Sequence, residues 1–172
     1  MPTFKEIEIA NKTYRAWQRD SICLDTVKHL TTRIYPLPVS ILDYGAGKGC
    51  IQTNKLRAWR DDKLHFGPIR VRIFAYDFGK NKNNLLHIDL EDYDPYDVIF
   101  ASNVLNVQSS LTMLRSTLEE IKSFSGGWFV FNYPQSPRKL NLTTKEMLAI
   151  VSEYFELSTP LRKDVWVGVE KC

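Results

Sequence analysis

The chain has 172 residues, a net charge of +3 and a hydrophobic content of 44%, which together predict one folded domain and exclude a disordered chain. The mild positive charge permits a nucleic-acid partner without pointing to one. No apolar run is long enough to cross a membrane, and the first residues lack the pattern of a signal peptide. The three cysteines are odd in number and lack metal-ligand spacing, so we expect a reducing compartment and a cytoplasmic protein.

Two parts are predicted along the chain. Residues 1–38 form an N-terminal helical extension, and residues 39–172 form the main domain. Apolar residues at helical spacing predict a helix from Tyr14 to Arg33, which Pro36 and Pro38 end. Such a helix could line a ligand pocket or only cover a sheet, and its pattern leaves both alternatives open.

The main domain begins with a strand, a glycine-rich turn and a helix. The apolar run Val39–Leu42 has the length and β-branched content of a buried parallel strand. It leads into Asp43-Tyr44-Gly45-Ala46-Gly47-Lys48-Gly49, and a helical pattern over Ile51–Asp61 follows. This order is the first half of a nucleotide-binding unit, in which glycine permits a tight turn and the close approach of a ligand.

The spacing of the glycines distinguishes between cofactors. The dinucleotide pattern G-x-G-x-x-G requires glycine or alanine at position 50, where this chain has Cys50. Here the glycines alternate, at Gly45, Gly47 and Gly49. Together with Asp43 they match each fixed position of (Asp/Glu)-x-Gly-x-Gly-x-Gly. In this the chain resembles the class I, Rossmann-like methyltransferases that use S-adenosylmethionine.

The resemblance implies a fold and a cofactor. The expected fold is a three-layer α/β Rossmann-like methyltransferase sandwich, whose seven-stranded sheet is mostly parallel, has the order 3-2-1-4-5-7-6 and contains an antiparallel last strand. Asp43 would hold the amino group of the cofactor's methionine moiety, and the loop backbone would give it room. The cofactor residues expected in this loop are Asp43, Tyr44, Gly45, Ala46, Gly47 and Gly49.

The second predicted strand, Ile69–Tyr76, ends at Asp77. An acidic residue at this place in nucleotide-binding α/β units accepts hydrogen bonds from ribose hydroxyls, so we expect Asp77 to bind ribose. Phe78 would then lie against the adenine ring. The polar residues 79–84 replace the helix that usually follows, so the fold is expected to be trimmed here.

A short third strand is predicted at Leu85–Leu90. The resemblance implies that Asp89, near its end, meets the adenine amino group and that Leu90 forms an apolar wall. The alternative for Asp89 is one acid among many in a solvated loop. We interpret His87, a single histidine among apolar residues, as a buried and hydrogen-bonded side chain rather than a ligand or a base.

The fourth predicted strand, Asp97–Ala101, runs into Ser102 and Asn103. In open parallel sheets, ligands bind beyond the carboxyl ends of the strands at the point where the strand order reverses. The first and fourth strands flank that point. We therefore expect Ser102 and Asn103 to contact the cofactor, and Asn103 is also the candidate catalytic residue that would orient the methyl acceptor.

The methyl acceptor stays open at this stage. Amino-directed DNA methyltransferases usually carry (Asp/Asn/Ser)-Pro-Pro-aromatic where this chain has Ser102-Asn103-Val104-Leu105, and cytosine-C5 chemistry would need a cysteine there. The acceptor could be a small molecule, or a nucleic acid or protein bound by Arg138-Lys139 and Arg162-Lys163. The alternative function is a non-catalytic cofactor-binding or partner module, whereas the glycine spacing disfavours a nicotinamide enzyme.

The remaining elements complete the expected sheet. Ser109–Phe124 is an amphipathic helix that Ser109 or Ser110 could cap, and a strand at Gly127–Asn132 follows. A capping box between Thr143 and Glu146 predicts the start of a last helix that runs to about Tyr154. Two final strands, at 155–158 and 164–170, would form the terminal hairpin.

Overall fold

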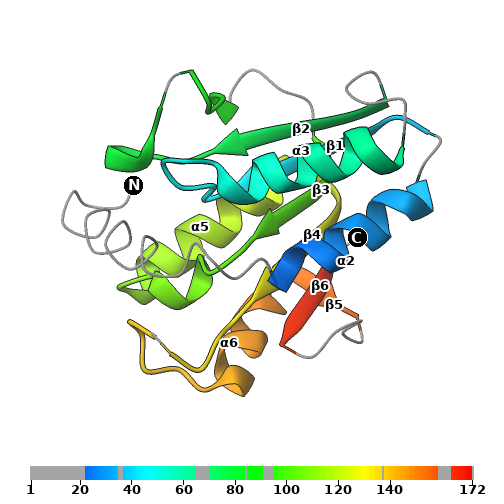
Figure 1. Ribbon diagram of the computed structural model, residues 1–172. Coiled ribbons are helices and arrows are strands. Elements are labelled where there is room, and N and C mark those ends of the chain that lie inside the picture. The colour runs from blue at the N-terminus through cyan, green and yellow to red at the C-terminus, as the bar shows by residue number, and fades with distance from the viewer. Residues whose placement is uncertain are drawn as a thin grey trace.

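The computed structural model describes residues 22–34, 37–64, 70–83, 85–90, 95–136, 138–158 and 164–171. Its centre is a six-stranded sheet with the order β2-β1-β3-β4-β6-β5 (Figure 1). The strands are β1 (Val39–Tyr44), β2 (Val71–Tyr76), β3 (Tyr96–Ala101), β4 (Ser125–Asn132), β5 (Phe155–Leu157) and β6 (Val165–Glu170). The first four strands are parallel, and β6 is antiparallel to both of its neighbours.

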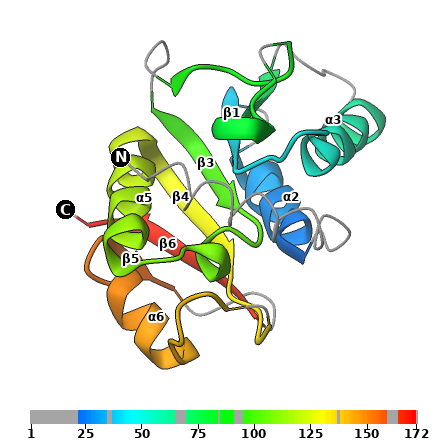
Figure 2. The same ribbon diagram turned by 90° about the vertical axis from the view of Figure 1, so that its left-hand side faces the viewer.

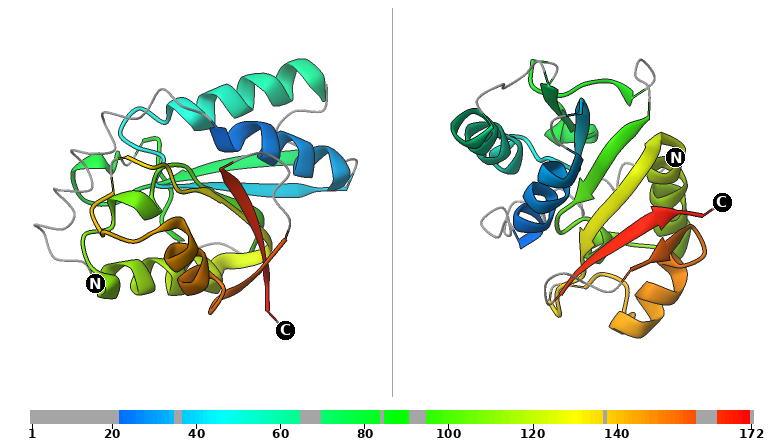
Figure 3. Two further views of the ribbon diagram at one scale, coloured as in Figure 1. Left: turned by 90° about the horizontal axis from the view of Figure 1, so that it is seen from below. Right: turned by 90° about the vertical axis from the view of Figure 1, so that its right-hand side faces the viewer.

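Helices cover both faces of this sheet (Figures 2 and 3). One face carries α2 (Ile22–Ile34) and α3 (Ile51–Lys63), and the other carries α5 (Leu111–Phe124) and α6 (Thr144–Val151). Side chains of a strand point alternately to the two faces, so Ile41 packs in the core below α2 and α3 while Leu42 packs in the core below α5. The structure is therefore the expected three-layer α/β sandwich.

The described strands confirm the expected order with one strand fewer. The strand predicted at Leu85–Leu90 is wrong, because this stretch forms a turn followed by irregular backbone. The expected seven-stranded sheet is accordingly a six-stranded one within the described residues. As a result β2, rather than a third strand, forms the outer edge of the described sheet on this side.

The outer edge of β2 is closed by other groups. Its outward carbonyls accept hydrogen bonds in three pairs: Val71 O from Arg60 Nη1 (3.1 Å), Ile73 O from Arg57 Nη2 (2.8 Å) and Ala75 O from the Ile88 N–H (2.9 Å). Arg60 is only 7% exposed, although its place among the charged residues 60–63 at the end of α3 predicts a solvated side chain. The two guanidinium groups occupy an edge whose carbonyls could otherwise form hydrogen bonds with another strand.

The helix signals in the sequence are confirmed where they are described. Ser110 caps α5 by accepting a hydrogen bond from the Met113 N–H, and Thr143 and Glu146 form the expected capping box of α6. The helix α2 covers the sheet, which was one of the two alternatives for it; the first part of the predicted Tyr14–Arg33 helix lies outside the described residues. No helix within the described ranges is long and apolar enough to cross a membrane.

Candidate functional site

Three segments meet at the carboxyl ends of β1, β2 and β3. The glycine loop (residues 45–50) lies against the end of β2, because the Gly45 and Ala46 N–H groups donate to Tyr76 O at 2.9 and 3.0 Å. It also lies against the segment that follows β3. A Cβ atom on Gly45 would come within 2.6 Å of Val104 Cγ2. The structure thus brings together the three segments that were expected to form the site.

Two of the three loop glycines have backbone conformations that favour glycine. Gly45 has φ +78° and Gly47 has φ +74°. Gly49 has no such conformation, and a Cβ there would meet only Ile51 Cγ1 at 3.7 Å, an ordinary contact. Cys50 takes the left-handed conformation instead, with φ 48°, just before α3 begins. The motif therefore shapes the loop mainly through Gly45 and Gly47.

Side chains hold both backbone polar groups of Gly47. Its N–H donates to Asp77 Oδ2 at 2.7 Å, while its carbonyl oxygen lies 2.9 Å from His87 Nε2. Asp77 Oδ1 also accepts from the Phe78 N–H at 2.8 Å. Burial raises the pKa of Asp77, and the two backbone N–H groups oppose that rise. The expectation that His87 is buried and hydrogen-bonded is confirmed, since it is only 7% exposed.

Asp43 lies beneath the glycine loop on the α3 face of the sheet. It is 1% exposed, and Oδ2 accepts a hydrogen bond from Thr53 Oγ1 at 2.6 Å. Burial raises the pKa of this carboxyl from 3.8 to about 7. Its described partner is therefore a hydroxyl of α3, and its contact with a cofactor ammonium group stays a prediction.

This pKa predicts how stability depends on pH. Folded Asp43 holds its proton up to about pH 7, whereas the unfolded chain loses it near pH 4, so the free energy of unfolding should fall as pH rises between these values. From about pH 5 to about pH 7 the fall should be about 2 kcal/mol larger in the wild type than in Asp43→Asn. Urea unfolding at the two pH values measures it.

The matched control is Asp62→Asn, since Asp62 is exposed on α3. Asp77 titrates in all three proteins, and its charge helps to raise the pKa of Asp43, so the comparison measures Asp43 together with its coupling to Asp77. Equal pH dependence of the wild type and Asp43→Asn would contradict the raised pKa.

Cys50 and His87 form a contact that resembles a nucleophile with its base. Cys50 Sγ lies 3.3 Å from His87 Nε2. Burial, however, raises the pKa of the Cys50 thiol to about 11, so it stays protonated at neutral pH. The pair therefore has no activated thiolate, and the imidazole contacts the glycine loop at Gly47 O instead.

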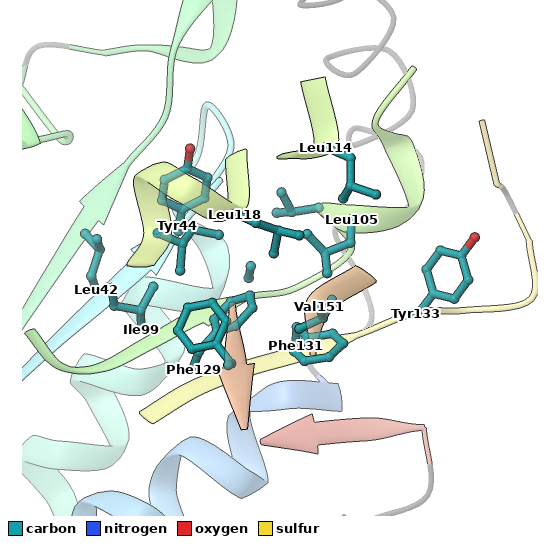
Figure 4. Packing of buried hydrophobic residues seen from close by; sticks show 14 of the residues in the cluster. Leu42, Tyr44, Ile99, Leu105, Leu114, Leu118, Phe129, Phe131, Tyr133 and Val151 are labelled. Carbon is teal, nitrogen blue, oxygen red and sulfur yellow. The ribbon is translucent and has the colours of Figure 1, made fainter. Parts of the chain in front are cut away.

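Tyr44 directs its side chain away from the glycine loop. Its ring lies in the core on the α5 face (Figure 4), where its hydroxyl donates to Glu120 Oε1 at 2.6 Å. Burial and the Glu120 carboxylate raise the pKa of Tyr44 well above its usual value. Only the backbone of Tyr44 is therefore placed beside the loop. Alternation along β1 gives this result, because Tyr44 shares its face with Leu42.

Asn103 forms a reciprocal pair with Asn132 at the end of β4. The Asn103 N–H donates to Asn132 Oδ1, and Asn132 Nδ2 donates to Asn103 Oδ1, both at 2.7 Å. Asn103 is 4% exposed and has φ 58°, so the pair fixes a turn that few residues other than glycine adopt. The neighbouring Ser102 is 3% exposed, and within the described part of the chain its Oγ has no hydrogen-bond partner. Our reading of the sequence missed the pairing with Asn132.

A cavity of about 740 Å³ opens beside the end of β2. It brings together four residues that were expected to contact the adenosine half of the cofactor, namely Asp77, Phe78, Asp89 and Leu90. Asp89 is paired there with Lys82. Our reading of the sequence missed the wall that α5 adds, which consists of Ser116, Glu119, Glu120, Ser123 and Phe124. The described residues contain no cluster of His, Cys, Asp and Glu that could hold a metal ion.

No protein-family model matches this chain, and no curated protein matches it. Solved structures do. A sugar N-methyltransferase from Streptoalloteichus sp ATCC 53650 is 13% identical with a TM-score of 0.59, over 94% of this chain and 92% of that chain. An N-methyltransferase from Bradyrhizobium japonicum WM9, in complex with S-adenosylhomocysteine, is 13% identical with a TM-score of 0.56, over 97% of each chain.

A third structure of the same kind is magnesium protoporphyrin IX methyltransferase from Synechocystis PCC 6803 with bound S-adenosylmethionine. It is 12% identical with a TM-score of 0.52, over 97% of this chain and 83% of that chain. At such identities the likeness is one of fold. The chain therefore has the Rossmann-like fold of the class I methyltransferases.

Proposed function

We propose that this chain is a methyltransferase that uses S-adenosylmethionine, bound across the carboxyl ends of β1 and β2. The observation that carries the proposal is the left-handed glycine loop held against the buried carboxylate of Asp77. That arrangement combines a backbone that a ligand can approach closely with an acceptor for ribose hydroxyls. The shared fold supports it.

The residues at the loop fit the ribose and methionine parts of this cofactor. An ionised carboxylate can accept about four hydrogen bonds. Asp77 accepts one backbone N–H at each oxygen and a further hydrogen bond from the Asn81 side chain, which leaves room for a ribose hydroxyl. The buried hydroxyl of Ser102 adds a polar group at the end of β3. We assign Asp43 to holding the first turn of α3, through Thr53, in addition to its predicted contact with the ammonium group.

The cavity beside β2 fits the adenine ring. Phe78 and Leu90 offer apolar surface, and Asp89 offers a carboxylate oxygen for the exocyclic amino group. Because Asp89 is paired with Lys82 in the structure, adenine would have to share or displace that contact. We place the adenosine half of the cofactor in this cavity.

The chemistry needs little from the protein beyond position. The cofactor supplies a methyl group already activated by its sulfonium, which passes to a lone pair of the acceptor. The task of the chain is then to align donor and acceptor, and alignment can lower the barrier by about 7–11 kcal/mol at best. We place the acceptor beside the rigid pair of Asn103 and Asn132, with Asn103 as the group that orients it.

We favour a small molecule as the acceptor over a nucleic acid. The guanidinium of Arg138 donates to Pro134 O, Leu142 O and Thr144 Oγ1 at 2.8, 3.0 and 2.9 Å, and it stacks 3.9 Å from the Tyr133 ring. It therefore holds its own loop together and has few donors left for a phosphate. The basic pair at 162–163 lies outside the described residues. Two of the similar structures, by name, act on a sugar and on magnesium protoporphyrin IX.

A second candidate is a non-catalytic module that binds the cofactor or a partner. The observation in its favour is the trimmed edge at β2, where two arginines stand in place of a strand. We further propose that the protein acts in the cytoplasm, since its three cysteines are odd in number and Cys50 is a buried thiol.

Calorimetric titration with S-adenosylmethionine, S-adenosylhomocysteine and NAD tests the proposal. We expect micromolar binding of the first two and none of NAD. Absence of binding by all three would overturn it and favour the partner module. Where the cofactor binds, release of S-adenosylhomocysteine with a panel of small amines separates an enzyme from a binding module.

A further inference from the structure

We infer that His87 is a positioning residue, whose ring N–H fixes the Gly47 carbonyl and so presets the glycine loop for its ligand. The functional half of this inference rests on the proposed cofactor site. His87 lies 40 residues beyond Gly47 in the chain, and its Nε2 is 2.9 Å from Gly47 O. The ring thus joins the glycine loop to the segment that follows β2.

The hydrogen bonds assign one tautomer to the ring. The Asn83 N–H lies 2.8 Å from His87 Nδ1 and the Asn83 carbonyl oxygen lies farther away, at 3.2 Å, so we assign Nδ1 as the acceptor of the shorter contact, without a proton. In a neutral imidazole the single proton then sits on Nε2. Nε2 faces the carbonyl of Gly47, which can only accept. His87 is therefore a donor to the loop, and its other nitrogen is anchored to the backbone of Asn83.

The consequence for the loop is that both peptide units flanking the Gly47 Cα are fixed, each by one side chain. Asp77 holds the N–H of Gly47, and His87 holds its carbonyl oxygen. Gly47 has φ +74°. A glycine without such contacts could adopt many other backbone conformations as well. Ribose hydroxyls would compete for the carboxylate of Asp77, whereas His87 has no role in that contact. His87 is thus the anchor that persists when the ligand binds.

A direct catalytic role for His87 does not fit this geometry. Its ring is 7% exposed and uses both nitrogens for backbone contacts, with Cys50 Sγ at 3.3 Å on one side. The ring acts through Gly47 instead. It also ties the glycine loop to the segment that carries Asp89 and Leu90, so one side chain sets the two halves of the site relative to each other.

Two substitutions separate the two hydrogen bonds of the ring. His87→Gln places an amide N–H near the position of Nε2 and keeps a donor for Gly47. His87→Asn places an oxygen near the position of Nδ1, which keeps an acceptor for Asn83 but loses the donor. The matched control is His29→Asn, since His29 is exposed on α2, away from the loop.

The first readout needs no ligand. We expect the Gly47 amide hydrogen to exchange with solvent about tenfold faster in His87→Asn than in the wild type, and His87→Gln and His29→Asn to stay near the wild type. The second readout is titration with S-adenosylhomocysteine, where we expect binding about tenfold weaker in His87→Asn and largely restored in His87→Gln.

The outcomes distinguish this inference from the proposed function. Exchange and affinity in His87→Asn equal to those of the wild type would overturn the inference. Equal losses in both variants, with equally lowered melting temperatures, would also overturn it, because His87 would then only stabilise its own segment. If the wild type binds no S-adenosylhomocysteine, the proposed function fails, and the exchange rates still decide whether His87 fixes the loop.

Discussion

Replacing Gly45 by alanine is expected to destabilise the protein by about 2–5 kcal/mol and to abolish binding at the glycine loop. A left-handed conformation costs a residue with a Cβ about 1–2 kcal/mol, and Gly45 has φ +78°. The new Cβ would also lie 2.6 Å from Val104 Cγ2, and such overpacking costs about 1–3 kcal/mol. Urea unfolding of Gly45→Ala measures the sum.

The chain offers controls that separate the two costs. Gly49→Ala makes the same chemical change four residues further along the loop. There the backbone is not left-handed, and the nearest side-chain atom is 3.7 Å from the new Cβ. It should be close to neutral. Adding Val104→Ala to Gly45→Ala should recover the steric part of the loss and leave the conformational part. A Gly49→Ala variant as unstable as Gly45→Ala would contradict the description of the loop.

Local patterns were enough to predict most of the sheet. Alternation and apolar runs located β1, β2, β3, β4 and both strands of the terminal hairpin, because each of these signals lies within a few residues. The two helix caps at Ser110 and Thr143 were likewise predictable, since a cap is a contact between residues three apart. The strand order followed from the resemblance.

The features that the sequence did not predict have a common physical cause, because each depends on contact between segments that are distant in the chain. The stretch 85–90 looks like a strand, yet Arg57 and Arg60 occupy two of the three outward carbonyls of β2, and only Ala75 O is left to pair with this stretch, through the Ile88 N–H. No periodicity in α3 distinguishes an arginine that reaches the sheet edge from one that faces water. A buried Arg60 is therefore visible only once α3 and β2 are side by side.

The candidate site shows the same division. The motif gave the glycine loop and Asp77, because glycines at fixed spacing and an acid at a strand end are local features. The two contacts that make the loop rigid were not predictable. His87 is 40 residues from Gly47, and Asn132 is 29 residues from Asn103. Such pairs depend on which strand ends meet, so they follow from topology rather than from sequence pattern.

A large effect on binding without a steric clash is expected from Asp77→Asn. The amide keeps the size of the side chain and loses the charge. Its NH2 group would also face the N–H of Gly47 or Phe78, so that two donors meet without an acceptor. A hydrogen bond to a charged group contributes about 1.5–3 kcal/mol, so losing the ribose contact should weaken S-adenosylhomocysteine binding about 10- to 100-fold. Calorimetric titration measures the loss, with Asp62→Asn as the exposed control.

A second ligand decides whether Asp77 binds ribose or only holds Gly47. The 2′-deoxy analogue of S-adenosylhomocysteine lacks one of the two ribose hydroxyls that could donate to Asp77. If the carboxylate accepts a hydrogen bond from that hydroxyl, the affinity of the wild type for the analogue should be at least about tenfold lower than for S-adenosylhomocysteine. Asp77→Asn should then bind the two ligands equally well. If both proteins show the same preference, the hydroxyl and the carboxylate do not interact. Asp77 would then affect the cofactor only by holding the Gly47 N–H, as His87 holds the Gly47 carbonyl. The ribose hydroxyls would need another acceptor in the cavity.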